Sequence, residues 1–423
     1  MKKRTYRGVE VKKANQERLA AALAGEDLVV GVDVGKEVCF GSLVGAEQEV
    51  QVTVKWKSPW ENREFVEFLG GLGCRSIAVA MEPSGSYGDP LRSLLWEAGI
   101  RVYRVSPKRS HDAAEVYDGV PSWHDAKSAA ILAKLHKDGA SEPWPFRSDE
   151  ERDLCAVVRT MARFDEQFHQ NVNRLEGHMA RYWPEVGAWL DFSCVTFLEL
   201  ILRFGGPAQI AQRAQEARET MRSVGGRFLK AEKIDAVIAC SGQTIGVSMT
   251  AQEAEELSNL AEHTLDLYGR LKQAKRKVDR LSCQQPSIEA LSRAVGKGTA
   301  AVLVVEGGDP RQYGSSSEWL KTFGLNLKER SSGKHIGRLK ITKRGSGRAR
   351  KWLYLAALRL IQKDLVVRTW YERKVARDGG TKRKKAIIAV MRKLVRALWY
   401  VGRGEPLDTS KMFDVKRLGL ACG

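Results

Sequence analysis

The chain has 423 residues, of which 43% are hydrophobic, and its 70 Lys and Arg against 51 Asp and Glu give a formal net charge of +19. A chain of this length is long for one compact domain, so two or three domains are expected. So large a positive excess favours a nucleic-acid partner over a membrane surface. No apolar run is long enough to cross a bilayer and no signal peptide is recognised, so we expect no membrane contact and a cytoplasmic, nucleoid-associated protein.

The cysteines are scattered along the chain, without a Cys-x-x-Cys pair or a nearby histidine. This spacing disfavours zinc ligation and a disulfide framework. Their odd number, seven, is typical of reduced thiols, and we expect them to pack as small core hydrophobes.

Residues 1–26 are polar, basic and Ala-rich, and they predict a helical or loose basic arm. From residue 27 the hydrophobic pattern is that of an α/β domain, with strands predicted at 28–33, 37–44, 48–56, 76–82 and 101–105. Helices are predicted at 59–69 and 89–98 and from Asp125 onward. Three strands, then helix, strand, helix, strand and helix, is the element order of an RNase H-like fold. We therefore predict an RNase H-like domain over residues 27–140.

The rest of the chain is predicted to be mostly α-helical. Residues 149–290 form a helical middle region, in which apolar residues recur every three or four positions over 252–283. That pattern predicts a long amphipathic helix or a coiled coil, which could either dimerise or pack against helices of its own chain. Residues 291–423 form the most basic region, a mostly α-helical C-terminal domain with helices predicted at 316–323, 345–362 and 380–401.

Three acidic residues occupy the places where an RNase H-like domain would hold metal ions. Asp33 and Glu82 each end an apolar run, and Asp125 opens a helix. Two divalent ions about 4 Å apart can stabilise both the attacking and the leaving oxygen of a phosphodiester. Because Mg²⁺ prefers a few carboxylates together with water and phosphate, these three residues predict a Mg²⁺ site.

A fourth carboxylate is expected one helical turn after Asp125, and the sequence has Ser128 there. Two alternatives are open. Asp112 or Asp118, from the preceding loop, could replace the missing ligand, or Ser128 could hold a metal-bound water.

A separate basic segment carries Ser332 directly before a glycine. A serine that attacks a phosphodiester needs cations to neutralise the phosphoryl oxygens. Six basic residues that surround Ser332 in sequence are therefore predicted to bind nucleic acid: Arg330, Lys334, Arg338, Lys340, Lys343 and Arg344. On composition alone, an ordinary loop that grips backbone phosphates is the stronger interpretation, with a nucleophile as the alternative.

An ordered set of short motifs runs through the chain. The N-terminal motifs are Val30–Lys36, Met81–Tyr87, Val105–Pro107 and His124–Ala129. The C-terminal motifs are Val295–Ala300, Gly324–Leu325, Ser332–Gly333, Ile341–Gly345 with Arg350 and Leu353, and Ala386–Val395. Together they cover essentially residues 28–410, and the set resembles the insertion-sequence 110 family of transposases, which are bridge-RNA-guided DNA recombinases.

The resemblance implies a RuvC-like N-terminal domain that holds Mg²⁺ with an Asp-Glu-Asp-Asp set. Asp33, Glu82 and Asp125 match its first three positions, and Ser128 stands at the fourth. It also implies a C-terminal serine transposase domain in which Ser332 attacks DNA and forms a phosphoserine link, with Ser331 as the weaker candidate.

The same resemblance implies the partners. The RuvC-like and serine transposase domains would meet across the subunits of a homo-oligomer, a dimer or a tetramer. A structured non-coding guide RNA would pair with donor and target DNA, so that the RNA chooses the sequence.

Ser128 departs from the family pattern, and three functions remain open because of it. The first is an RNA-guided DNA recombinase that cleaves and rejoins strands through Ser332. The second is a resolvase-like nuclease that uses metal and water alone. The third is a catalytically impaired relative that binds RNA and DNA.

Overall fold

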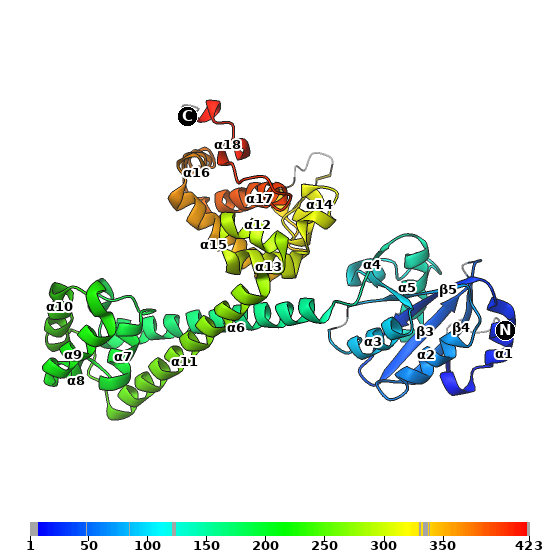
Figure 1. Ribbon diagram of the computed structural model, residues 1–423, viewed down its shortest axis with the longest axis horizontal. Coiled ribbons are helices and arrows are strands. Elements are labelled where there is room, and N and C mark those ends of the chain that lie inside the picture. Colours follow the sequence, from blue (N-terminus) through cyan, green and yellow to red (C-terminus); the bar gives the residue numbers. More distant parts are fainter. Residues whose placement is uncertain are drawn as a thin grey trace. The chain divides into compact units, whose positions relative to one another are not determined.

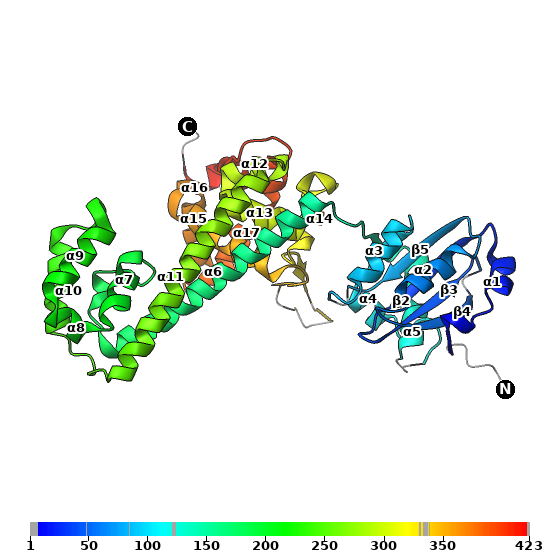
Figure 2. The same ribbon diagram turned by 60° about the horizontal axis from the view of Figure 1, so that its bottom comes forward.

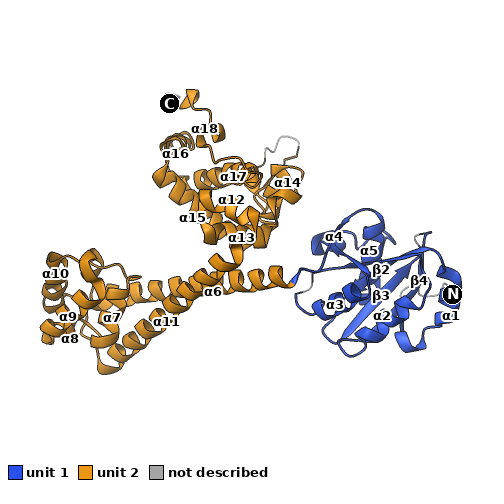
Figure 3. Cartoon of the chain, in the orientation of Figure 1, with its two compact units in different colours: residues 1–148 blue, residues 149–423 orange. Residues whose placement is uncertain are grey.

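The computed structural model describes residues 7–47, 49–83, 85–120, 124–329, 331–332, 337 and 339–420. The chain divides into two compact units, residues 1–148 and 149–423, which Figure 3 shows in different colours. The first unit is α/β. The second is almost wholly helical.

The first unit is built on a seven-stranded sheet with the strand order β1-β4-β3-β2-β5-β6-β7. Its strands are β1 (Gly8–Glu10), β2 (Asp27–Asp33), β3 (Val38–Val44), β4 (Val50–Lys57), β5 (Ser76–Met81), β6 (Arg101–Val105) and β7 (Ser141–Pro143). β2, β3 and β4 form an antiparallel meander, whereas β5 and β6 run parallel to β2. This topology confirms the predicted RNase H-like fold.

Helices cover both faces of this sheet (Figure 1). They are α1 (Gln16–Leu23), α2 (Asn62–Gly70), α3 (Asp89–Glu97), α4 (Pro107–Asp112) and α5 (Asp125–Lys137). Side chains alternate between the faces of a strand, and β2 follows this rule. Leu28, Val30 and Val32 pack in the core that α2 and α3 complete, whereas Val29 packs against Ala133 of α5.

The N-terminal segment differs from the predicted arm. β1 pairs in parallel with β4, and the short 3₁₀ helix η1 (Val11–Lys13) and α1 follow it. Val11 and Leu23 are buried in the same core as α2 and α3. Residues 7–26 therefore belong to the α/β domain, and at its other end β7 extends the sheet beyond residue 140.

Two long helices organise the second unit, α6 (Asp149–Tyr182) and α11 (Ala251–Ser282), and they pack against each other in both views of the ribbon (Figures 1 and 2). The long amphipathic helix predicted at 252–283 is thus confirmed, and its apolar face covers a helix of its own chain. Four shorter helices connect α6 to α11 in the sequence and share a core with one end of the pair. They are α7 (Val195–Phe204), α8 (Pro207–Gln212), α9 (Ala214–Gly225) and α10 (Ala231–Gly242).

The C-terminal helices form the second core of this unit. They are α12 (Pro286–Val295), α13 (Lys297–Gly307), α14 (Ser316–Thr322), α15 (Gly347–Lys363), α16 (Leu365–Arg377), α17 (Arg383–Val401) and α18 (Thr409–Met412). Leu154 and Val158 of α6 and Leu271 and Val278 of α11 belong to the same core. A two-stranded hairpin, β8 (Leu327–Lys328) and β9 (Lys340–Ile341), extends from these helices. The three predicted C-terminal helices are confirmed, and α16 and α18 are additions to them.

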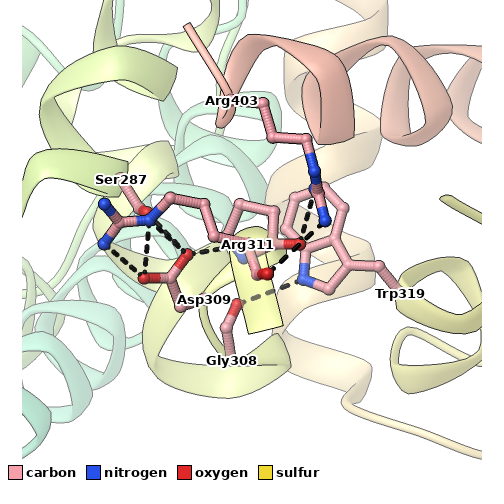
Figure 4. Close-up of polar contacts among 7 residues, drawn as sticks. Ser287, Gly308, Asp309, Arg311, Trp319 and Arg403 are labelled. Atoms are coloured by element: carbon pink, nitrogen blue, oxygen red, sulfur yellow. Dashed lines mark hydrogen bonds and ion pairs between the residues drawn. The ribbon is translucent and has the colours of Figure 1, made fainter. Parts of the chain in front are cut away.

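The turn after α13 is tied to the helices around it by a set of hydrogen bonds and an ion pair (Figure 4). Asp309 accepts a hydrogen bond from Ser287 Oγ at 2.6 Å and pairs with Arg311. The indole of Trp319 donates to Gly308 O at 3.1 Å, and Arg403 donates to Pro310 O at 2.8 Å. These bonds fix the turn against α12, α14 and α17.

Two further findings concern the described part of the chain. Its six cysteines, at positions 39, 74, 155, 194, 240 and 283, are all free thiols. None of its helices combines the length and the apolar character that a membrane span requires.

Candidate active site

The register of the sheet brings Asp33 and Glu82 side by side. Val32 of β2 is paired with Met81 of β5 in a parallel ladder, so the next residue of each strand, Asp33 and Glu82, lies at the same carboxyl edge. Neighbouring strands are about 4.8 Å apart. Both acids follow residues that face α2 and α3, so both belong to the opposite face, which α5 covers.

Gly31 allows α5 to lie directly on β2. A Cβ atom at Gly31 would stand 1.9 Å from Ala129 O and 2.4 Å from Ala133 N. No larger residue fits there, because the obstructing atoms are helix backbone. The absence of a side chain at Gly31 lets α5 approach closely, so that its first turn, with Asp125 and Ser128, comes to the carboxyl edge of β2.

A buried hydroxyl pair fixes the same helix to the neighbouring strands. Ser42 of β3 lies 2.9 Å from Thr53 Oγ1 of β4, and its hydroxyl also donates to Ala126 O in the first turn of α5 at 3.3 Å. Ser42 is opposite Gly31 in the sheet. The start of α5 is therefore held at the strands that flank the acidic residues.

The electrostatics show that the three carboxylates share one site. The pKa of Asp33 is raised from 3.8 to about 6, first by burial and then by the charges of Asp125 and Glu82. Like charges that crowd a partly buried site make ionisation unfavourable. Asp33, Glu82 and Asp125, predicted as metal ligands from the sequence, are thus gathered at one place in the structure.

Ser128 stands at this site as well. Its side chain is buried, and Oγ meets no partner within hydrogen-bonding geometry. The hydroxyl is nevertheless close enough to Asp33 to lower the pKa of that carboxyl slightly against the effect of burial. A buried hydroxyl without a hydrogen-bond partner is unfavourable, and Ser128 Oγ is such an atom beside Asp33.

The two alternative acids from the preceding loop have other partners. Asp118 pairs with the buried Lys127 of α5 at 2.8 Å, and Asp112 pairs with Lys108 at 2.7 Å. Neither of them is among the charges that raise the pKa of Asp33. Lys127 Nζ also donates to Val120 O at 2.5 Å, so it ties the loop before α5 to the helix.

Glu82 is held by a residue that the sequence did not single out. The hydroxyl of Ser110, in α4, donates to Glu82 Oε1 and lies buried behind it. As the side chains stand, no three His, Cys, Asp or Glu residues of the described chain converge closely enough to ligate one ion. The carboxylates are close enough to repel one another, but their oxygens are too far apart to ligate the same ion.

Ser332 belongs to the second unit and lies in the loop that joins β8 to β9. Its side chain is exposed. Ser331, in contrast, is engaged within the loop, since its hydroxyl donates to Glu329 Oε1 at 2.6 Å and accepts from the Gly337 N–H at 2.9 Å. The candidate nucleophile is thus accessible at the end of a hairpin, beside a serine that is hydrogen-bonded locally.

The base of this hairpin is a close backbone junction. Gly324 and Gly345 both have positive φ, and a Cβ atom on Gly345 would stand 2.1 Å from Thr322 O. Arg350 Nη1 donates to Phe323 O at 3.1 Å and to Gly345 O at 2.9 Å. Glycine is required where backbones approach this closely, and the junction holds the hairpin against α14 and α15.

Half of the predicted nucleic-acid ligands can be placed. Lys340, Lys343 and Arg344 lie on the β9 side of the hairpin, and all three side chains are exposed. Arg330, Lys334 and Arg338 lie outside the described residues. Lys343 has a φ of 57°, which puts it and Arg344 in the tight turn that follows β9.

The sequence analysis assigned no structural role to four residues that shape these sites: Gly31, Ser110, Lys127 and Arg350. One of them had a signal. A glycine inside a strand of valines often marks the close approach of another backbone, and Gly31 shares its face with Asp33. The roles of Ser110, Lys127 and Arg350 depend on tertiary contacts that have no local pattern.

Two family models match the chain in succession. A transposase model of the DEDD type from the IS110 group matches residues 30–184, and the model of the transposase IS116/IS110/IS902 family matches residues 292–372. The first range contains Asp33, Glu82, Asp125 and Ser128. The second contains the whole hairpin with Ser332.

Curated relatives match over most of the chain. The uncharacterised 43.6 kDa protein of insertion element IS110 from Streptomyces coelicolor is 24% identical over 397 residues, 90% of this chain and 96% of the relative. The uncharacterised 42 kDa protein of insertion element IS900 from Mycobacterium paratuberculosis is 26% identical over 326 residues, 73% of this chain and 78% of the relative.

Among solved structures, T. thermophilus RuvC in complex with a Holliday junction substrate is 18% identical and covers 28% of this chain and 99% of its own, with a TM-score of 0.23 that is too low to carry an argument. The two family models match the α/β domain and the hairpin domain in order, and the relatives span both. The chain belongs to the IS110 family of transposases.

Proposed function

We propose that the chain is an RNA-guided DNA recombinase that cleaves and rejoins strands through Ser332, with Mg²⁺ at the acidic site. The observation that carries this proposal is the crowding of Asp33, Glu82 and Asp125 at one sheet edge, with the pKa of Asp33 raised to about 6 by burial and by the other two acids. Such a site is unfavourable without a cation and favourable with one. A transposase acts on phosphodiesters, which is the chemistry that a divalent ion at this edge would assist.

The donor set fits Mg²⁺ in its chemistry. It offers three carboxylates and one hydroxyl, all hard oxygen ligands, and Ser128 Oγ has no other partner. The side chains do not close on one point, and mutual repulsion of the acids favours this open arrangement. Asp33, Glu82 and Asp125 would hold the ion, with the Ser128 hydroxyl as a further oxygen beside them, and the chemistry supplied there would be Lewis-acid polarisation of a phosphodiester.

The hairpin supports a role for Ser332 as the nucleophile. Its hydroxyl is exposed at the end of a hairpin whose base is fixed by Gly324, Gly345 and Arg350. Lys340, Lys343 and Arg344 are exposed on the same hairpin and would neutralise the phosphoryl oxygens during attack. Ser331 is engaged by Glu329 and Gly337, which makes it the weaker nucleophile.

The guide RNA and the oligomer belong to the same proposal. A net charge of +19 suits a chain that must hold RNA together with donor and target DNA. The acids and Ser332 belong to different units of the chain, so assembly of a dimer or tetramer could complete a composite site across subunits. These partners follow from the family resemblance.

A second candidate function has one observation in its favour. Ser128 stands where the family has its fourth acid, and the described side chains do not form a closed ligand set. A relative that binds RNA and DNA without cleaving them would show both features. A nuclease that uses metal and water alone is the remaining alternative, in which Ser332 only contacts phosphate.

A cleavage assay with divalent metal separates the active enzyme from the inactive relative. The full chain, co-expressed with the DNA that flanks its gene, is incubated with donor and target DNA with and without Mg²⁺. Glu82→Gln removes one ligand charge and is expected to abolish metal-dependent cleavage. Glu97→Gln is the matched control, because Glu97 is exposed on α3 and belongs to no site. Absence of cleavage by the unaltered protein, or equal loss in both variants, contradicts the proposed metal site.

A further inference from the structure

A cavity of about 460 Å³ opens in the α/β domain, away from the acidic site. It lies between α3, β6 and the segment that follows β7. A cavity of this size is typical of sites that bind small ligands or parts of larger ones. Its walls combine flat aromatic rings with two guanidinium groups. The rings belong to Trp96, Tyr103, Trp144 and Phe146, and the guanidinium groups belong to Arg92 and Arg101.

The cavity is far from the carboxylates along the sheet. Arg101 is the first residue of β6, which runs parallel to β5, whereas Glu82 follows the last residue of β5. The cavity and the acids therefore lie at opposite ends of these strands. Arg101 is paired with Ala78, four residues before Glu82, so it lies about 13 Å from the acidic edge along the strand.

Arg92 gives the cavity a cation that is stacked on an aromatic ring. Its guanidinium carbon lies 3.8 Å from the centroid of the Trp144 ring, and Nη1 donates to Asp89 at 2.8 Å. The side chain is only 11% exposed, and its Nε is buried without a hydrogen-bond partner. The Nε atom is closed off by its surroundings, so Arg92 contributes its positive charge, and not a free N–H, to the wall of the cavity.

The walls are suited to a flat ring. Trp96 is 56% exposed at the rim, although a large apolar side chain gains from burial. Trp144 is fixed by its own backbone, whose N–H donates to Val102 O at 2.8 Å. Arg101 is exposed at the rim, where its charge can meet a phosphate.

We propose that this cavity binds one unpaired nucleobase of a single-stranded nucleic acid. The base stacks on the tryptophan rings, and the flanking phosphate meets Arg101. Stacking on aromatic rings is tolerant of sequence and is a usual way of holding single strands. The ligand class rests on the proposed function, and the binding step itself does not involve the acidic site.

Photo-crosslinking tests the proposal on the full chain. Short single-stranded RNA and DNA probes that carry iodouracil are crosslinked, and the modified peptides are identified by mass spectrometry. We expect crosslinks on the peptides that contain Trp96 or Trp144. Trp96→Ala is expected to reduce their yield about tenfold, the effect of losing one stacked base. A preference for the RNA or the DNA probe identifies the source of the base.

Trp60→Ala is the matched control, because Trp60 is 84% exposed on the same domain and does not line the cavity. Its crosslinking should equal that of the unaltered chain. Crosslinks found only elsewhere, or equal yields in the two variants, overturn the proposal. A change in the sedimentation coefficient of the nucleic-acid-free protein on Trp96→Ala also overturns the proposal. Such a change would mean that a second copy of the chain, and not a nucleobase, occupies the cavity.

Failure of the nucleobase site can be distinguished from failure of the proposed function. Asp33→Asn should abolish cleavage and leave the crosslink to Trp96 or Trp144 intact. Trp96→Ala should lose the crosslink and keep the binding of Mg²⁺, measured by calorimetry. Loss of the crosslink in Asp33→Asn would contradict a separate site.

Discussion

Replacement of Asp33 by asparagine should stabilise the metal-free protein at neutral pH. The ordinary pKa of an aspartate carboxyl is 3.8, and in the folded chain the pKa of Asp33 is raised to about 6. Burial is the first cause of this rise, and the charges of Asp125 and Glu82 follow. A raised carboxyl pKa means that the folded state keeps the proton longer than the unfolded state does. The free energy of unfolding therefore falls as the pH rises from about 4 to about 6, and the full penalty remains above that range.

A rise of about two pKa units corresponds to about 3 kcal/mol. Because Asp33 is only partly buried, solvent screening lowers the expected gain to about 1 to 3 kcal/mol for Asp33→Asn at pH 8. The gain should be far smaller at pH 4, where the carboxyl is protonated in both states. Added Mg²⁺ should shrink the gain at pH 8, because a bound cation relieves the repulsion among the acids.

Hydrogen exchange of the full chain in chelator, at pH 4 and pH 8, measures this locally on peptides from β2 and α5. Asp112→Asn is the control, since Lys108 lowers the pKa of that exposed carboxyl and its removal cannot stabilise the fold. Asp33→Asn should slow exchange in β2 and α5 strongly at pH 8 and far less at pH 4. A gain that is equal at both pH values, or a gain in the control, would show that crowding of the carboxylates does not destabilise the folded chain.

Three other substitutions test the framework of the sites. Gly31→Ala places a Cβ atom 1.9 Å from Ala129 O, so it should destabilise the α/β domain by about 3 kcal/mol and weaken metal binding, whereas Gly70→Ala, in open space, should change the melting temperature little. Ser128→Asp supplies a fourth carboxylate and should tighten Mg²⁺ binding about tenfold by calorimetry, and an unchanged affinity would show that position 128 is not a ligand. Gly345→Ala puts a Cβ atom 2.1 Å from Thr322 O at a positive φ, so it should abolish strand exchange and leave Mg²⁺ binding intact, whereas Gly347→Ala should be tolerated.

The acidic site could be predicted from the sequence because each part of it has a local signal. Asp33 and Glu82 each end an apolar run, and Asp125 opens a helix, so the ends of elements were visible before their pairing was known. The topology of an RNase H-like domain then puts these ends together. The structure adds the register that makes Asp33 and Glu82 neighbours and the close contact at Gly31 that brings α5 to them.

Other features had no such signal. β1 is a three-residue strand whose residues are mostly exposed, so it lacks the apolar alternation by which strands are recognised, and the segment was predicted as an arm. Ser110 and Lys127 act through single contacts with residues distant in sequence or in a neighbouring loop. The cavity beside Trp96 and Trp144 requires α3, β6 and the segment after β7 to meet, and only the fold brings them together.

A covalent protein–DNA adduct is the product that distinguishes a serine recombinase from a nuclease that uses metal and water alone. The full chain is expressed with the DNA that flanks its gene, incubated with donor and target DNA and Mg²⁺, denatured, and examined for DNA attached to a serine. We expect an adduct on Ser332 that disappears in Ser332→Ala and in Asp33→Asn and persists in Ser331→Ala. Cleaved DNA without an adduct, or an adduct that survives in Ser332→Ala, would contradict it.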